Sequence, residues 1–445
     1  MKSANEKIFY HIYPLGFCGA PHKNSSVEGV TERILKIIDW IPHMKYLGVN
    51  ALYLGPVFES VEHGYDTVDY YRVDKRLGTN ESLKYVISKL HENGIEVILD
   101  GVFNHVGREF FAFKDLQSNR ENSRYVNWFD GIDFSKRSPY NDSFGYNNWA
   151  GHFSLVKLNL KNRETEEYLI NAAKFWIDEF DIDGIRLDAA DTLDFNFMKK
   201  LSVELKSKKQ EFWLMGEVVH GDYRRWVNEG GLDCTTNYEC YKGLYSSHND
   251  KNYFEIAYSL KREFGENGVY KEIPMYNFAD NHDVDRVTTS INKKAHLYPL
   301  YTILFTMPGV PSVYYGSEWK IEGHKGGYND LEIRPALEIG RMNSEYETDL
   351  IGYIATLSKI KNQENTLKYG SYKELFVKSE QFGFEREYQN ETLNIMVNSS
   401  DNEVTVNDIG IKNGKYYDLM KSEEIEIWNN SVILEGNSGI ILKRM

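Results

Sequence analysis

The sequence predicts an α/β protein: a (β/α)8 TIM barrel that carries one inserted subdomain and is followed by a C-terminal antiparallel β-sandwich. Strand-like runs alternate with helical patterns in units of roughly thirty residues, and about eight such units favour a closed barrel over an open sheet. One long stretch without this alternation interrupts the barrel after its third strand. The last part contains only short strands with period-2 alternation. These observations place the barrel at 1–105 and 162–364, the insertion at 106–161 and the sandwich at 365–445.

The barrel elements follow from hydrophobic periodicity. Between the first two strands, apolar residues recur at the helical spacing, for example at Ile34, Ile37, Ile41 and Met44. The expected strands cover 8–17, 51–58, 96–105, 183–191, 212–219, 275–283 and 312–318. The expected helices cover 30–48, 82–94, 163–180, 193–209, 251–264 and 295–306. The insertion is rich in Asn, Asp, Ser and aromatic residues and shows no clear helix, so we expect a small subdomain over the barrel mouth.

Composition excludes several classes of function. The 445 residues carry a net charge of −14, which argues against binding to duplex nucleic acid or to anionic membranes, because both need a basic surface. Three cysteines cannot form a disulfide framework and are typical of a reducing compartment. No secretory signal is visible, and no apolar run approaches the roughly 20 residues of a membrane span. We therefore expect a cytoplasmic protein.

Three carboxylates follow predicted strands at spacings that match whole barrel units. Glu217 lies 29 residues after Asp188, about one unit, and Asp283 lies 66 residues after Glu217, about two units. If Asp188 ends the fourth strand, the other two end the fifth and seventh, and all three meet at the C-terminal mouth of the barrel. The alternative is that each is a solvated residue at a strand end, but their common spacing favours convergence.

Such a set of groups is suited to glycoside cleavage. A retaining glycosidase uses two carboxyl groups about 5–5.5 Å apart, one as the nucleophile and one as the acid and base. Arg186 lies two residues before Asp188, so both side chains share one face of the strand. A guanidinium beside a carboxylate favours the ionised form that a nucleophile needs.

At this point the chain resembles the α-amylase family of glycoside hydrolases over essentially its whole length. The matching motifs are DGVFNH (100–105), GIRLDAAD (184–191), GEVVH (216–220), FADNHD (278–283) and GVPSVYYGSE (309–318). The resemblance implies that Asp188 is the nucleophile and Glu217 the general acid and base. It also implies that Asp283 orients the sugar and supports its distortion.

The same resemblance implies further contacts with the sugar that is attacked. It assigns His105, Arg186 and His282 to the −1 subsite, and Tyr65 of HGYD (63–66) to stacking beneath that sugar ring. Asp330 and Arg334, from the segment DLEIR, would pair near this subsite. For the two histidines, the alternative role is that of hydrogen-bonded core residues.

Two positions depart from the family pattern and bear on calcium. Where many members have Lys-His after the nucleophile motif, this chain has Asp191 and Thr192. Where the family motif LPDLN has an aspartate, this chain has Lys157, a cation where Ca²⁺ wants carboxylate oxygen. Asn104 stays as one candidate ligand. We therefore expect no metal at the usual interdomain site and no other cofactor.

The segment 155–159 and His220 resemble the maltodextrin-acting branch of neopullulanases and cyclomaltodextrinases. Enzymes of that branch usually have an extra N-terminal domain, which we do not expect here because the first barrel strand begins near Ile8. The expected partner is an α-glucan oligosaccharide, with no nucleic acid or membrane partner, and the oligomeric state stays open. The expected reaction is retaining hydrolysis of α-1,4 links in maltooligosaccharides.

Other functions stay open on the same fold. The chain could be an α-glucosidase or a transglycosylase on short α-glucans, with pullulan or α-1,6 links as further substrates. An inactive sugar-binding homologue and phosphorolysis of sucrose are the remaining alternatives. Aromatic residues of the predicted mouth could stack on sugars or pack locally: Phe103, Trp128, Phe129, Tyr146, Trp149, Phe153 and Trp319.

Overall fold

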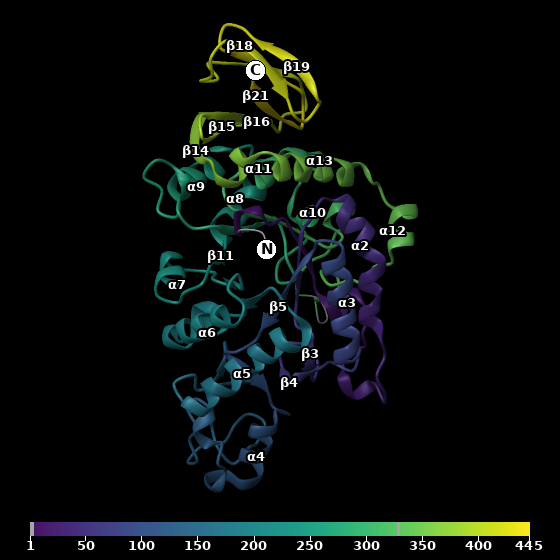
Figure 1. Ribbon diagram of the computed structural model, residues 1–445, viewed down its shortest axis with the longest axis vertical. Helices are drawn as coiled ribbons and strands as arrows, with labels where there is room; N and C mark the ends of the chain where they lie inside the picture. Colours follow the sequence, from purple (N-terminus) through teal and green to yellow (C-terminus); the bar gives the residue numbers. More distant parts are fainter. Residues whose placement is uncertain (1–3, 327–329) are drawn as a thin grey trace.

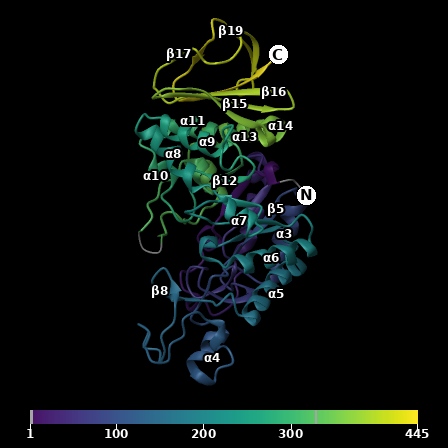
Figure 2. The same ribbon diagram turned by 90° about the vertical axis from the view of Figure 1, so that its left-hand side faces the viewer.

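The computed structural model describes residues 4–326 and 330–445. Three parts follow one another along the long axis of the molecule: the C-terminal sheets, the barrel and the inserted subdomain, which contains α4 (Figure 1). A quarter turn shows the same order, with the insertion at the end opposite the C-terminal sheets (Figure 2). The predicted fold class is confirmed.

The barrel is a closed ring of eight parallel strands, in the order β1-β13-β12-β11-β10-β9-β5-β2. Strands that follow one another along the barrel are neighbours in the ring and pair in parallel. All their carboxyl ends therefore lie at one mouth of the barrel. Their bounds are β1 (Phe9–Ile12), β2 (Ala51–Leu54), β5 (Glu96–Gly101), β9 (Gly184–Leu187), β10 (Trp213–Gly216), β11 (Cys234–Thr236), β12 (Met275–Phe278) and β13 (Val310–Tyr314). A separate two-stranded sheet is formed by β3 (Phe58–Ser60) and β4 (Thr67–Val73).

Helices surround the barrel, and several shorter turns connect the elements. The α-helices outside the insertion are α1 (Pro14–Phe17), α2 (Lys36–Tyr46), α3 (Asn80–Glu92), α5 (Arg163–Phe180), α6 (Phe195–Lys208), α7 (Arg224–Asn228), α8 (Tyr238–Asn249), α9 (Phe254–Phe264), α10 (Val287–Ser290), α11 (Leu297–Thr306), α12 (Ile339–Glu345), α13 (Asp349–Gln363) and α14 (Asn365–Tyr369). Among the 3-10 turns, η6 (Ala190–Thr192) and η8 (Ser317–Trp319) lie beside the mouth strands β9 and β13.

Helix α5 shows why the periodic pattern predicts helices well. It spans the predicted range 163–180. The side chain of Asn162 caps its first turn by accepting a hydrogen bond from the Thr165 backbone N–H, and Glu164 and Glu166 place negative charge at the positive end of the helix dipole. The helix ends at Phe180, and the next residue, Asp181, has a left-handed backbone with φ of 56°.

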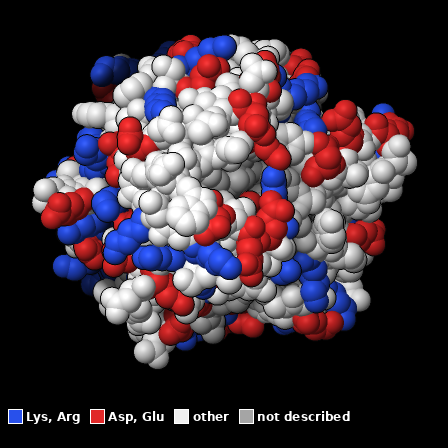
Figure 3. Space-filling model, turned by 90° about the horizontal axis from the view of Figure 1, so that it is seen from above, with Lys and Arg blue, Asp and Glu red and all other residues white. Residues whose placement is uncertain are grey.

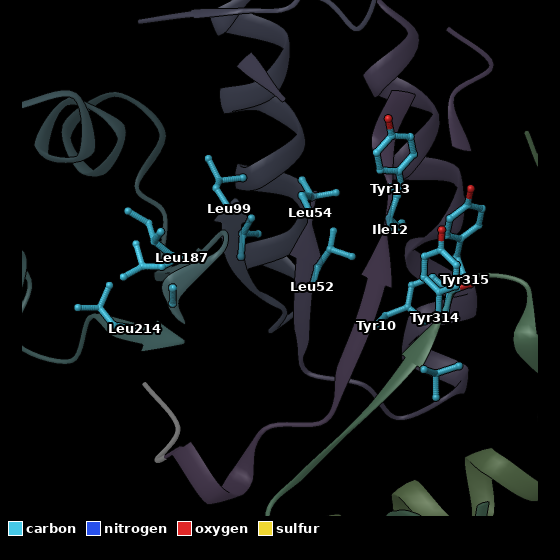
Figure 4. Close-up of a cluster of buried hydrophobic side chains, with 14 of the residues drawn as sticks. Tyr10, Ile12, Tyr13, Leu52, Leu54, Leu99, Leu187, Leu214, Tyr314 and Tyr315 are labelled. Atoms are coloured by element: carbon cyan, nitrogen blue, oxygen red, sulfur yellow. The ribbon is translucent and has the colours of Figure 1, made fainter. Parts of the chain in front are cut away.

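Two hydrophobic cores lie on the two sides of the barrel wall. Side chains such as Tyr53, Ile98 and Trp213 form a small cluster from the strands alone. Alternate residues of the same strands, such as Leu52, Leu99 and Leu214, join the large cluster under the helices. Figure 4 shows leucines of neighbouring strands aligned in this second layer. The alternation explains why the strands are apolar on both faces.

The insertion contains a helix that the sequence did not predict. Helix α4 (Phe111–Asn119) lies in the chain between the first and second strands of a three-stranded sheet with the order β6-β8-β7. The strands are β6 (His105–Gly107), β7 (Asn148–Trp149) and β8 (His152–Lys157). The expectation that this region lacks a helix is therefore wrong. Only Ala112, Phe113 and Leu116 of α4 are buried, so the helix depends on the aromatic core of the insertion rather than on a strong pattern of its own.

The C-terminal region is antiparallel, as predicted, but its two sheets differ in size. The larger has the order β14-β15-β16-β21-β18-β19 and the smaller pairs β17 with β20. The bounds are β14 (Ser371–Val377), β15 (Gln381–Tyr388), β16 (Glu391–Asn398), β17 (Val404–Asn407), β18 (Gly414–Asp418), β19 (Glu423–Ile427), β20 (Ser431–Leu434) and β21 (Ser438–Arg444). Their facing side chains form a third core that includes Met396, Val406 and Leu442.

The outer face of this domain carries acidic and basic side chains around an uncharged centre, and this face shows no continuous basic surface (Figure 3). Among residues 4–326 and 330–445, no helix is long and apolar enough to cross a membrane.

Candidate active site

The three predicted carboxylates all lie at the C-terminal mouth of the barrel. Asp188 directly follows β9 and Glu217 directly follows β10, whereas Asp283 lies five residues beyond the end of β12. The backbone N–H of Glu217 still donates to Leu187 O, at 3.0 Å, so the strand ladder itself positions this residue. All three side chains line one cavity of about 670 Å³.

Arg186 joins the two carboxylates that are suited to the chemistry. Its Nη1 lies 3.0 Å from Asp188 Oδ1, and its Nη2 lies 2.7 Å from Glu217 Oε2. The backbone N–H of Ala189 also donates to Glu217 Oε2, at 3.0 Å. A single buried guanidinium thus holds both carboxyl groups side by side.

A fourth carboxylate, Asp100, anchors that arginine. Both oxygens of Asp100 accept hydrogen bonds from Arg186 Nη1, at 2.8 and 3.0 Å. The hydroxyls of Tyr53 and Tyr65 also donate to Asp100 Oδ2. Asp100 opens the motif DGVFNH but was not among the predicted site residues. The signal that could have identified it is its place at the end of β5, the strand that pairs directly with β9.

The protonation of Asp188 reflects opposing effects. Burial raises the pKa of its carboxyl group, the charge of Arg186 lowers it, and the nearby charges of Glu217, Asp100 and Asp283 raise it again, so that the pKa lies well above its usual range. The expectation that Arg186 keeps Asp188 ionised considered only the charge of Arg186. In the ligand-free site, burial and the neighbouring carboxylates outweigh that charge.

Asp283 has the opposite electrostatic environment. Its Oδ2 lies 2.9 Å from His282 Nε2, and its Oδ1 accepts a hydrogen bond from Arg334 Nη2 at 3.0 Å. Although burial raises the pKa of Asp283, the charge and hydrogen bond of His282, together with Arg334, hold it well below its usual range. Asp283 is therefore a permanent anion at neutral pH.

The predicted pair of Asp330 and Arg334 borders the same cavity. Arg334 Nη2 lies 3.5 Å from Asp330 Oδ2, and its Nε donates to His282 O at 3.0 Å. The guanidinium also lies 4.6 Å above the ring of Tyr13. Arg334 thus connects the loop after η8 to the residues around Asp283.

Tyr65 and His105 line other parts of the cavity. The hydroxyl of Tyr65 bridges Asp100 and His282 Nε2, and its ring is nearly parallel to that of His282, at an angle of 9°. Burial lowers the pKa of His105 to about 3, so its imidazole is neutral at physiological pH. Its Nδ1 contacts the Asn104 amide at 3.2 Å, whereas its Nε2 has no hydrogen-bond partner among the described residues.

Only one of the other candidate aromatic residues lines the cavity. Trp149, from β7, lies beside His105 with a distance of 5.8 Å between the ring centroids. Phe103 stacks on Trp176, and Trp319 stacks on His43, so both belong to the packing. Further candidates belong to the large hydrophobic cluster: Trp128, Phe129 and Tyr146, with Phe153 packed against it. For these residues, the packing interpretation applies.

The positions expected to affect calcium lie around the base of the insertion. Lys157 pairs with His105 in the strand register, and its Nζ lies 4.0 Å from Asp130 Oδ2. The neighbouring Leu158 N–H donates to Asn104 O, while Asn104 Oδ1 is buried without a partner among the described residues. Thr192 Oγ1 donates to Ala189 O at 2.8 Å. Within the described residues, no group of three or more His, Cys, Asp or Glu side chains could hold a metal ion.

Comparison with known proteins decides the family. A model of the α-amylase catalytic domain matches residues 12–381. The chain belongs to the α-amylase family. The resemblance found in the motifs is thereby confirmed, and so is the prediction that the protein is a glycoside hydrolase.

Several members of the α-amylase family are similar over most of the chain. Cyclomaltodextrinase of Thermoanaerobacter pseudethanolicus is 32% identical over 429 residues, which cover 92% of this chain and 70% of that enzyme. Intracellular maltogenic amylase of Bacillus subtilis is 30% identical over 335 residues, which cover 74% of this chain and 55% of that enzyme. Among solved structures, the cyclic α-maltosyl-(1→6)-maltose hydrolase from Arthrobacter globiformis superposes with a TM-score of 0.84 at 26% identity and covers 99% of both chains.

Proposed function

We propose that the protein hydrolyses α-1,4-glucosidic bonds of maltooligosaccharides with retention of configuration at the anomeric carbon. The observation that carries this proposal is the contact of Asp188 and Glu217 with one guanidinium in a single cavity. Retaining glycosidases need two carboxyl groups close to one glycosidic bond. The similarity to enzymes named cyclomaltodextrinase and maltogenic amylase supports maltodextrins as the substrate class.

In the first step, Asp188 in its ionised form, which the charge of Arg186 favours, attacks the anomeric carbon while the bond to the leaving oxygen breaks. A proton carried by Glu217 moves to that oxygen, so the departing sugar leaves as an alcohol. Glu217 becomes an anion as it loses the proton. Arg186 Nη2 and the N–H of Ala189 already point at its Oε2 and stabilise the new charge without reorganisation.

In the second step, water replaces the departed sugar. Glu217 takes a proton from the water while the water oxygen attacks the anomeric carbon. The ester bond between that carbon and Asp188 breaks in the same step. Both steps pass through a flattened sugar ring with positive charge. The permanent anion Asp283 is suited to bind the hydroxyls of that ring, and binding that strengthens as the ring flattens lowers the barrier.

We further propose that ring-closed maltooligosaccharides are substrates. Two similar proteins are named for cyclic glucans, one a cyclomaltodextrinase and the other a hydrolase of cyclic α-maltosyl-(1→6)-maltose. The size of the cavity, about 670 Å³, lies in the range of sites that take several-ring ligands. The name of the second relative also supports tests of substrates with α-1,6 links.

We propose that this site works without calcium at the base of the insertion. The buried Asn104 Oδ1 could act as one ligand. However, Lys157 supplies an ammonium group where a carboxylate would be needed, and Ca²⁺ takes six to eight oxygen ligands. The residues present therefore fit calcium poorly.

We also infer a cytoplasmic location. The three cysteines of the protein are free and buried, which is typical of proteins from a reducing compartment. The similar B. subtilis enzyme is named as intracellular. Detection of the native protein in the culture medium rather than in the cell fraction would contradict this inference.

A product time course tests the reaction. Maltoheptaose, a cyclic maltooligosaccharide, pullulan, isomaltose and sucrose are supplied separately, and the anomer of the first product is read by NMR. We expect the α-anomer first from maltoheptaose; the β-anomer would exclude retention. Products longer than maltoheptaose would identify a transglycosylase, and cleavage of isomaltose but not maltoheptaose would contradict the α-1,4 assignment. The matched control is Glu217→Gln, which should lose turnover on these natural glycans.

A further inference from the structure

Tyr238 brings a phenolic hydroxyl to the carboxyl group of Glu217. It is the first residue of α8 and directly follows Asn237, whose side chain caps the helix by accepting a hydrogen bond from the Cys240 N–H. The side chain of Tyr238 lines the active-site cavity. Its hydroxyl donates toward Glu217 Oε1, at 3.5 Å. Such contacts are often long in a site without substrate and shorten when the substrate binds.

The two oxygens of the Glu217 carboxyl group have different partners. Oε2 lies 2.7 Å from Arg186 Nη2 and accepts a hydrogen bond from the Ala189 N–H, at 3.0 Å. An oxygen that faces two donors is a poor place for a proton, because the hydrogens would point at one another. The proton that Glu217 gives to the leaving oxygen is therefore carried by Oε1. This is the oxygen that Tyr238 faces.

Asn281 fixes the direction in which the Tyr238 hydroxyl donates. The backbone N–H of Asp283 donates to Asn281 Oδ1, at 2.7 Å. A backbone N–H can only donate, so the amide oxygen of Asn281 must face it, and the amide nitrogen then faces Tyr238. That nitrogen, Nδ2, donates to the hydroxyl oxygen of Tyr238, at 3.1 Å. Because its oxygen accepts this bond, the hydroxyl directs its own hydrogen toward Glu217 Oε1.

The phenol of Tyr238 keeps its proton at neutral pH. Burial and the negative charges of Glu217 and Asp283 raise the pKa of Tyr238 well above its ordinary value. Tyr238 is therefore a permanent hydrogen-bond donor and not a second acid of the reaction. Its ring packs edge-on against Phe278, with 5.0 Å between the ring centroids, so the position of the hydroxyl is fixed by packing.

We propose that Tyr238 is a further catalytic residue, which holds Oε1 of Glu217 as the proton-donating oxygen and stabilises the anion formed there. This role rests on the proposed function and deepens it. In the first step, the O–H bond at Oε1 breaks, the proton passes to the leaving sugar oxygen, and the carboxyl group becomes negative. The hydrogen bond from Tyr238 strengthens at that moment, because hydrogen bonds to charged groups are stronger than neutral ones. In the second step, Oε1 takes a proton from water.

The pH dependence of kcat/KM distinguishes this role from a simple contact with the sugar. The basic limb follows the loss of the acidic proton from the free enzyme. Tyr238→Phe removes a donor that favours this loss, so the limb should move to higher pH by about one unit. On maltoheptaose, kcat/KM at neutral pH should fall by about tenfold. The charged groups around the reacting pair all keep their side chains in this variant: Asp100, Arg186, Asp188, Asp191 and Asp283.

Tyr241→Phe is the matched control. Tyr241 is the next tyrosine of α8 and also packs against Phe278, with 5.2 Å between the ring centroids. It is not among the described residues that line the cavity. Its variant loses a hydroxyl from the same helix and should keep the basic limb of the wild-type enzyme, with kcat/KM within about twofold.

Asn281→Asp tests the same contact from the other side. The aspartate retains an acceptor for the Asp283 N–H but replaces the amide donor with a second acceptor oxygen. The Tyr238 hydroxyl then donates to that oxygen and turns away from Glu217. The basic limb should therefore move to higher pH, as in Tyr238→Phe.

The role of Tyr238 is overturned if Tyr238→Phe lowers kcat/KM but keeps the basic limb of the wild-type enzyme, or if it behaves like Tyr241→Phe. A wild-type enzyme that leaves maltoheptaose intact but cleaves pullulan or isomaltose refutes only the proposed α-1,4 specificity. The same profiles are then measured on the glycan that is cleaved, because every retaining cleavage at this site uses the proton of Glu217. If none of these glycans is cleaved, both the proposed function and the role of Tyr238 are refuted.

Discussion

Asp100 accepts two hydrogen bonds from Nη1 of Arg186, at 2.8 and 3.0 Å, in the buried floor of the active site. This contact fixes the guanidinium so that it also meets Asp188 and Glu217. Burying a charge is costly unless it is paired, and here three carboxylates share one cation. The geometry of the reacting pair therefore depends on a carboxylate from a neighbouring strand.

The first prediction concerns this anchor. Asp100→Asn keeps the shape but removes the charge, so we expect misplacement of Arg186 and a fall in kcat of about 10²-fold. Breaking a buried ion pair should also lower the free energy of unfolding by about 3–5 kcal/mol. Steady-state kinetics and urea unfolding measure the two effects. Tyr53→Phe is the control, since it removes only one hydrogen bond to Asp100. Unchanged kcat in Asp100→Asn would contradict the anchoring role.

A second prediction concerns the ionisation of Asp283. In the wild-type protein, His282 and Arg334 hold its pKa well below the usual range, so it stays an anion in mild acid. Arg334→Met removes one of these charges, the pKa of Asp283 rises, and the acidic limb of kcat/KM moves to higher pH. Asp330→Asn, which removes the charge of a second carboxylate beside Arg334, should shift the limb less. Identical profiles for Arg334→Met and the wild-type enzyme would count against this reasoning.

The third prediction concerns Trp149 as a platform for the sugar. Its ring lines the cavity beside His105 without belonging to the buried core. Trp149→Ala should raise KM by about tenfold with little change in kcat, because stacking holds the substrate in the ground state and the transition state alike. Trp149→Phe retains a ring and should lie between the two. A loss of kcat without a change in KM would instead indicate a role in the chemical step.

The fourth prediction concerns stability in acid. Burial lowers the pKa of His248 from its ordinary value of 6.5 to about 3 in the folded protein. Between these two pH values the unfolded chain binds a proton that the folded chain does not bind. The free energy of unfolding therefore falls as the pH drops below about 6.5. The fall is at most about 1.4 kcal/mol per pH unit. His248→Gln should flatten this dependence, whereas His324→Gln on the surface should not. Urea unfolding between pH 4.5 and 7 measures it; parallel curves for both variants would refute the prediction.

The fifth prediction concerns calcium. The melting temperature of the wild-type protein should not change with EDTA, because Lys157 opposes a cation near Asn104. Lys157→Asp replaces the ammonium group with a carboxylate at the strand position paired with His105 and should make the melting temperature rise with added Ca²⁺. Lys157→Met, which removes the charge without adding a ligand, is the control. A large drop in the wild-type melting temperature on adding EDTA would contradict the calcium-free proposal.

Several features could be predicted from the sequence because they depend on local pattern. Helix α5 follows from its apolar stripe and its Asn162 cap. The spacing of Asp188, Glu217 and Asp283 follows from the repeat of the barrel units. The short strand β11 has only three residues, so its existence could be inferred from the spacing but its position could not.

Other features could not be predicted, because they depend on contacts between segments far apart in the chain. Helix α4 is stabilised by the aromatic core of the insertion, and Phe103 and Trp319 are buried by partners that the local sequence does not name. The role of Asp100 likewise appears only when strands β5 and β9 are brought together.

The sequence by itself determined the barrel, its interruption, the family and the carboxylates at the strand ends, since periodicity and motif spacing are written along the chain. Only the tertiary structure decided which charges meet. It places Arg186 between Asp100, Asp188 and Glu217, and it buries Asp283 against His282 and Arg334. The physical reason is that the pKa and reactivity of a carboxyl group depend on burial and on neighbouring charges within a few ångströms, which the order of residues does not specify.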